Sequence, residues 1–165
     1  MKTLIAYYSR TGTTRKVALA LAERLGADVE ELKDTKERGG PINYVIAGKD
    51  AAMRKLVPIE PVERDPAAYG LVVVGTPVWA GTMATAVRAY LTETAAKLPQ
   101  VAFFSTFGGG PGHALADMQE LAGRTPVATL AQKEKHIKKD EHLDELEAFV
   151  GTIRAEFPDE PAEGE

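Results

Sequence analysis

A hydroxyl-rich segment runs from Ser9 to Thr14 and contains one serine, three threonines and one glycine. It follows a short apolar run and precedes a stretch with helical periodicity. The N-terminus of a helix attracts anions through its unpaired backbone N–H groups and its dipole, and hydroxyls can donate further hydrogen bonds. The spacing differs from that of a Walker A loop, and a single glycine does not make a dinucleotide fingerprint. The segment therefore predicts a phosphate-binding turn, with a helix capped by a threonine as the alternative.

Two uncharged segments that contain glycine could receive the rest of such a ligand. The segment from Gly75 to Thr82 contains the only tryptophan of the chain, Trp79. This side chain could stack on a flat ring, or it could fold back as a lid over the core. The segment from Ser105 to Gly112 contains four glycines, so its backbone can approach a ligand closely. His113 follows it, and we expect a solvated surface residue there.

Short apolar runs alternate with stretches of helical periodicity along the chain. Continuous apolar runs of this length are typical of parallel strands that are covered on both faces. The predicted strands are 4–8, 27–32, 71–74, 101–104 and 127–130, and the predicted helices are 17–25, 43–56, 87–95, 115–122 and 143–157. This alternation predicts an α/β fold of three layers, with a doubly wound, five-stranded parallel sheet in the middle.

In doubly wound sheets, ligands bind outside the carboxyl ends of the strands. The three segments described above all follow predicted strands at that edge, so they can form one site. One phosphate turn beside a flat, uncharged pocket fits FMN better than a dinucleotide. The predicted cofactor-binding residues are Ser9, Arg10, Thr11, Gly12, Thr13, Thr14, Thr76, Pro77, Val78, Trp79, Ala80, Gly81, Thr106, Phe107, Gly108, Gly109 and Gly110.

Two of these motifs resemble those of a known family. The segment from Ser9 to Thr14 matches the flavodoxin phosphate-loop pattern (S/T)-x-T-G-x-T at every defined position. Thr76 to Thr82, followed by Ala86 to Leu91, looks like the flavin loop of small flavodoxin-like proteins. The resemblance to the flavodoxin family covers residues 1–157. It implies the strand order 2-1-3-4-5, FMN phosphate on the first loop, and the isoalloxazine ring between the second and third loops.

Two differences between this chain and the electron-carrier flavodoxins determine the function that we expect. Electron-carrier flavodoxins usually stack an aromatic residue from the later flavin loop and surround the site with acids, whereas here that loop offers only Phe107 and the three loops contain no Asp or Glu. We therefore expect an FMN-dependent oxidoreductase that passes electrons to a small acceptor such as a quinone. The donor would be NADH, NADPH or a flavoprotein reductase. The alternatives are a one-electron carrier for a protein partner and a non-enzymatic module of the same fold. Because the flavin carries the chemistry, no catalytic side chain is assigned.

Composition excludes several other classes. The chain of 165 residues has no cysteine, so disulfide scaffolds, thiolate metal sites and thiol nucleophiles are excluded. The net charge of −4 equals the four acids of residues 158–165, which leaves 20 acidic and 20 basic residues before them. We expect no nucleic-acid partner, no membrane span and a cytoplasmic location. Residues 1–157 are predicted to form one domain, and residues 158–165 a disordered acidic tail.

The remaining polar residues do not point to another chemistry. No Asp ends the predicted strands 4–8 and 71–74, which argues against a response regulator. Ser9 and Ser105 both lack the G-x-S-x-G context of a hydrolase nucleophile. The three histidines are scattered, so no metal site is expected. Two of them lie between Lys133 and Glu145, a charged stretch that we predict to be a solvated linker and helix face.

Overall fold

The structure is a computed structural model that describes residues 1–35, 45–49, 51 and 58–158. Its centre is a parallel sheet in the order β2-β1-β3-β5-β6, which confirms the predicted order and strand number of the parallel sheet. A sixth, antiparallel strand, β4, pairs with the end of β3. The strands are β1 (Thr3–Tyr7), β2 (Asp28–Glu31), β3 (Leu71–Trp79), β4 (Thr82–Met83), β5 (Gln100–Phe107) and β6 (Thr129–Lys133).

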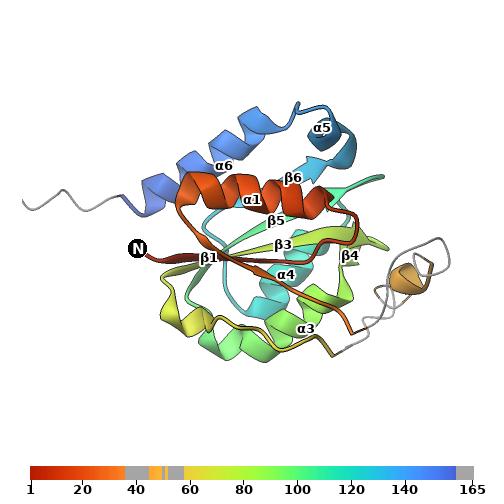
Figure 1. The fold of residues 1–165 in the computed structure, drawn as a ribbon, viewed down its shortest axis with the longest axis horizontal. Coiled ribbons are helices and arrows are strands. Elements are labelled where there is room, and N and C mark those ends of the chain that lie inside the picture. Colours follow the sequence, from red (N-terminus) through yellow and green to blue (C-terminus); the bar gives the residue numbers. More distant parts are fainter. Residues whose placement is uncertain (36–44, 50, 52–57, 159–165) are drawn as a thin grey trace, which may run out of the picture.

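Helices cover both faces of this sheet (Figure 1). On one face lie α1 (Thr13–Leu25), α5 (Glu134–Lys138) and α6 (Leu143–Glu156), and on the other lie α3 (Thr85–Thr94) and α4 (Ala114–Ala122). Two single-turn 3₁₀ helices, η1 (Pro66–Ala68) and η2 (Ala95–Lys97), lie in connections. The three-layer α/β fold is therefore confirmed.

β1 is almost continuously hydrophobic because the side chains on both of its faces are buried. Successive side chains of a strand point to opposite faces of the sheet. Leu4 and Ala6 accordingly belong to the core beneath α3 and α4, whereas Ile5 and Tyr7 belong to the core beneath α1 and α6. Because both faces are covered, burial fixes the position of the strand ends, where the loops of the predicted site begin.

The hairpin of β3 and β4 was not predicted from the sequence. β3 continues beyond Val74, and Val78 and Trp79 then pair with Met83 and Thr82. The two residues between the strands, Ala80 and Gly81, have φ angles of 49° and 80°. A type I′ turn requires positive φ at both central positions, and Asn-Gly or Asp-Gly is the pair that indicates such a turn. The pair Ala80-Gly81 does not match this pattern, so the sequence did not indicate the hairpin.

Two sequence predictions lie partly or wholly outside the described residues. Residues 45–49 are helical, as predicted for 43–56, but most of the rest of that range is not described. The predicted disorder of the acidic tail concerns residues of which only Pro158 is described. Within the described part of the chain, no helix is long and apolar enough to cross a membrane.

The charged stretch from Lys133 to Glu145 was predicted to be solvated, and this prediction is wrong in part. It contains α5, in which Ile137 is 1% exposed, and His142 directly before α6 is 2% exposed. The backbone oxygen of His142 accepts a hydrogen bond of 2.8 Å from Gln132 Nε2 on β6. The burial of Ile137 and His142 was not predicted, because each is a single inward-facing position among charged residues. Such single positions do not form an apolar run in the sequence.

Burial of His142 predicts a stability that depends on pH. Burial lowers the pKa of His142 below its ordinary value, and Lys16 acts in the same direction, whereas Asp140 and the His136 backbone oppose it. The unfolded chain takes up a proton on this ring below a pH of about 6.5, but the folded protein resists protonation. The unfolding free energy should therefore fall as the pH decreases from about 7 to about 5.

Urea unfolding at both pH values measures this loss, and the His142→Asn variant should show less of it than the wild type. In the folded protein, NMR should give a titration midpoint of the His142 ring below its ordinary value. A midpoint at or above about 6.5 would contradict the prediction.

Candidate functional site

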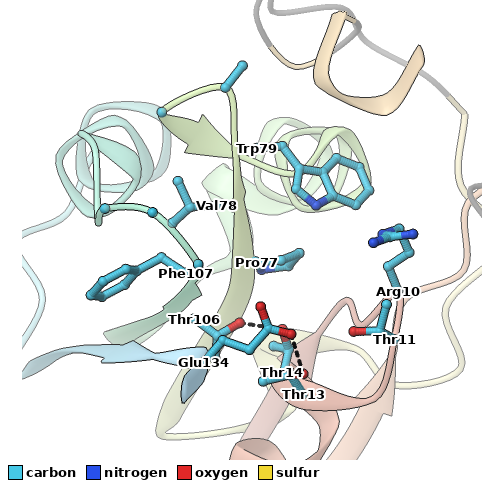
Figure 2. Close-up of a pocket in the computed structure, with 15 residues that line it drawn as sticks. Arg10, Thr11, Thr13, Thr14, Pro77, Val78, Trp79, Thr106, Phe107 and Glu134 are labelled. Atoms are coloured by element: carbon cyan, nitrogen blue, oxygen red, sulfur yellow. Dashed lines mark hydrogen bonds between the residues drawn. The ribbon is translucent and has the colours of Figure 1, made fainter. Parts of the chain in front are cut away.

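A pocket of about 290 Å³ lies at the carboxyl ends of β1, β3 and β5 (Figure 2). Its walls come from the three predicted loops and from the first residue of α5. The residues that line it are Arg10, Thr11, Thr13, Thr14, Pro77, Val78, Trp79, Ala80, Gly81, Thr106, Phe107, Gly108, Gly109, Gly110 and Glu134. All predicted cofactor-binding residues are among them except Ser9, Gly12 and Thr76.

The first loop places the N-terminus of α1 at the pocket. Ser9 Oγ accepts hydrogen bonds of 3.1 Å from the backbone N–H groups of Gly12 and Arg15, so this hydroxyl shapes the turn instead of lining the pocket. The N-cap residue of α1 is Gly12, which has no capping side chain, and the first turn of the helix contains no acid. The alternative of a threonine cap is therefore wrong. The positive end of the helix dipole remains directed at the pocket, where it favours an anion.

The threonines of this loop connect it to other elements. The hydroxyls of Thr14 and Thr106 lie 2.8 Å apart and are buried, which joins the start of α1 to the end of β5. Thr13 Oγ1 donates a hydrogen bond of 3.3 Å to Glu134 Oε1 (Figure 2). Thr11 is exposed. This end of the pocket thus offers hydroxyl donors next to a helix N-terminus, which is the donor set that suits a phosphate.

The β3–β4 hairpin forms a second wall, and Trp79 belongs both to the pocket and to the core. Its side chain lines the pocket, but it is only 6% exposed and packs edge-to-face on Tyr8, with ring centroids 5.3 Å apart.

Thr76 is fully buried; its Oγ1 accepts from the Ala84 backbone N–H at 3.0 Å and donates to the Pro77 carbonyl at 2.8 Å. Thr76 therefore holds the hairpin in place beneath the pocket.

The glycine-rich third loop contacts the hairpin through its backbone. The His113 backbone N–H donates a hydrogen bond of 2.7 Å to the Gly81 carbonyl. Gly112 has a φ of +53°, and a Cβ atom there would lie 2.3 Å from that same oxygen. The glycine is required because the two backbones meet at this point, which we call the loop junction (Gly81, Gly112 and His113). The His113 side chain is 58% exposed, as predicted, and its Nδ1 lies 2.6 Å from Asp117 Oδ2.

Glu134 is the pocket residue that sequence reasoning missed. The fifth strand was predicted to end at 130, but β6 continues to Lys133 and brings Glu134 to the same edge of the sheet as the three loops. The extension was not predicted because Gln132 and Lys133, which follow soon after Leu130, are polar. The three loops contain no acid, as the sequence shows, and the acid of the pocket comes from α5, outside these loops. Arg10 and Glu134 are the charged residues among the described lining.

Comparisons with known proteins agree with this geometry. A model of the flavodoxin family matches residues 2–153. A flavoprotein from Lactobacillus acidophilus NCFM, solved in complex with FMN, is 25% identical with a TM-score of 0.67, and the alignment covers 84% of this chain and 97% of that one. Two-electron reduced Megasphaera elsdenii flavodoxin is 18% identical with a TM-score of 0.58, covering 93% and 98%. An NADH:FMN oxidoreductase in its apo form is 15% identical with a TM-score of 0.58, covering 98% and 92%. No curated protein matches the chain.

Proposed function

The chain belongs to the flavodoxin family, and on this basis we propose that it binds FMN and acts as an FMN-dependent oxidoreductase. The observation that carries the proposal is the convergence of three loops on one pocket that is hydroxyl-rich at the start of α1 and uncharged between the hairpin and the glycine loop. The Lactobacillus acidophilus flavoprotein, which was solved with FMN, supports the choice of cofactor.

The residues of the pocket fit the two parts of FMN. Thr11, Thr13 and Thr14, with the N-terminus of α1, would hold the phosphate. Pro77 to Gly81 and Phe107 to Gly110 would enclose the ring, since these segments bring apolar side chains and open backbone to the pocket. When bound, the flavin supplies the electron-transfer chemistry. The residues that line the pocket would bind the flavin and orient it.

The Thr11→Ala variant tests the phosphate end. We expect FMN binding to weaken by about 1–3 kcal/mol, the range for a hydrogen bond to a charged group. Riboflavin, which lacks the phosphate, should lose far less. Thr11 is exposed, so the stability of the flavin-free protein should not change. Fluorescence titration with both flavins measures the effect, and Thr152→Ala on α6 serves as a distant control. Equal losses for FMN and riboflavin would show that the phosphate binds elsewhere.

For the reaction, we propose electron transfer from NADH or NADPH to a small, uncharged acceptor such as a quinone, in the cytoplasm. The opposite charges of Arg10 and Glu134 leave the pocket lining formally neutral, and residues 1–157 are balanced as well. A net charge of zero gives no overall electrostatic attraction toward a charged protein partner, so it favours a small acceptor over a carrier role.

Native mass spectrometry of the purified protein, followed by an assay, separates the possible functions. A mass increase equal to FMN and quinone-dependent oxidation of NADH or NADPH by the protein alone are expected. Electron transfer that occurs only after addition of a flavoprotein reductase would instead identify a carrier. A protein that binds no flavin would be a non-enzymatic module of the fold.

A further inference from the structure

Glu134 introduces a negative charge into the end of the pocket that should receive a phosphate. It is the first residue of α5, and its carboxylate points toward α1 (Figure 2). Its Oε1 accepts a hydrogen bond of 3.3 Å from the hydroxyl of Thr13, the first residue of α1. A Cβ on Gly108 would lie 3.6 Å from its Oε2. The carboxylate therefore lies between the helix N-terminus and the glycine-rich loop.

The same oxygen of Glu134 has a second partner, which is on α5 itself. Lys138, four residues later, places its Nζ 3.3 Å from Oε1. The Lys138 side chain is 69% exposed, so it can follow the carboxylate at little cost. The two cations in the first turn of α1 pair with other acids: Arg15 pairs with Glu31, and Lys16 pairs with Asp140.

A carboxylate and a phosphate with nearly two negative charges repel each other when they compete for one donor. We propose that Glu134 is a specificity-determining residue: its carboxylate occupies the Thr13 end of α1, competes there with the phosphate of FMN, and gives up Thr13 while it keeps Lys138 when the phosphate binds. The inference rests on the proposed function, because it concerns the same pocket. Its consequence is that Glu134 weakens FMN relative to riboflavin, which has no phosphate.

The Glu134→Gln variant tests this competition by titration of the whole chain with FMN and with riboflavin. FMN should bind about tenfold more tightly than to the wild type, which equals about 1.4 kcal/mol, and riboflavin affinity should remain unchanged. Screening should reduce the gain at about 0.5 M salt. Glu134→Ala removes the same charge and should change the ratio of the two affinities in the same direction. Glu141→Gln alters the net charge equally at an exposed position outside the pocket, and should leave both affinities unchanged.

The role of Lys138 is tested by combining two substitutions. Lys138→Gln should weaken FMN in the wild-type background but not in the Glu134→Gln background, because without the carboxylate no exchange partner is needed. An equal loss in both backgrounds would show that Lys138 acts on the phosphate directly, and would overturn the exchange.

Other outcomes separate the two proposals from each other. An unchanged FMN-to-riboflavin ratio in both Glu134 variants would overturn the inference and leave FMN binding intact. Weaker binding of both flavins would do the same, because it would mean that Glu134 contacts a part that the two ligands share. A wild-type protein that binds neither flavin would overturn the proposed function itself.

Discussion

Replacing Trp79 by alanine is expected to lower the unfolding free energy of the flavin-free protein by about 3–5 kcal/mol, as for other large buried aromatic residues. The side chain is 6% exposed and packs edge-to-face on Tyr8, so its removal leaves a cavity between the hairpin and the core. For a chain of this length, the loss corresponds to a fall of about 10 °C in Tm. Calorimetry or denaturant unfolding of the flavin-free protein measures it.

The same substitution should also weaken FMN, because Trp79 lines the pocket. A loss of about 1–2 kcal/mol is expected from the missing aromatic contact and buried area. Trp79→Phe is the matched control, since it keeps an aromatic ring against Tyr8 and should retain most of the stability. An alanine variant as stable as the wild type would contradict the burial of Trp79. Unchanged FMN affinity in a destabilised variant would instead assign Trp79 to the core alone.

Trp79 illustrates how far the sequence could define the site. Its position between Gly75 and Thr82 predicted either stacking on a ligand or a lid on the core. In the structure, Trp79 lines the pocket and is also buried against Tyr8. Sequence patterns assign a residue to a loop, but they do not tell how much of its surface the neighbouring strands cover. Such coverage depends on contacts between distant segments, which no local pattern contains.

The strands and most of the pocket could be predicted because they depend on short-range patterns. Runs such as 71–74 are apolar on both faces, so their burial is visible in the sequence, and their shared carboxyl edge follows from the parallel arrangement. The strand order itself came from the resemblance to flavodoxins. β6 was different: it alternates between exposed and buried residues, and buried Gln132 looks polar in the sequence. Its true end, and with it the position of Glu134, could not be predicted.

Gly112→Ala is expected to disrupt the loop junction, with a loss of about 2–5 kcal/mol in unfolding free energy from the left-handed backbone and the clash together. Gly112 has a φ of +53°, and the new Cβ would lie 2.3 Å from the Gly81 carbonyl. The backbone fixes the position of the new Cβ, and the Gly81 oxygen is itself a backbone atom, so a change of rotamer cannot relieve the clash. The third loop must move away from the hairpin, which breaks the bond of 2.7 Å from His113 N–H to Gly81.

Because Gly112 does not line the pocket, any loss of flavin affinity must come from the displaced walls. Both walls of the ring site meet at this junction, so FMN and riboflavin should weaken together, by at least about tenfold. Gly110→Ala is the matched control for stability: nothing lies within 4 Å of a Cβ there and its φ is not positive, so the flavin-free protein should unfold as the wild type does. Equal stability of the two alanine variants would show that the loops do not meet at Gly112. A selective loss of FMN alone would place the effect at the phosphate end, which the junction does not touch.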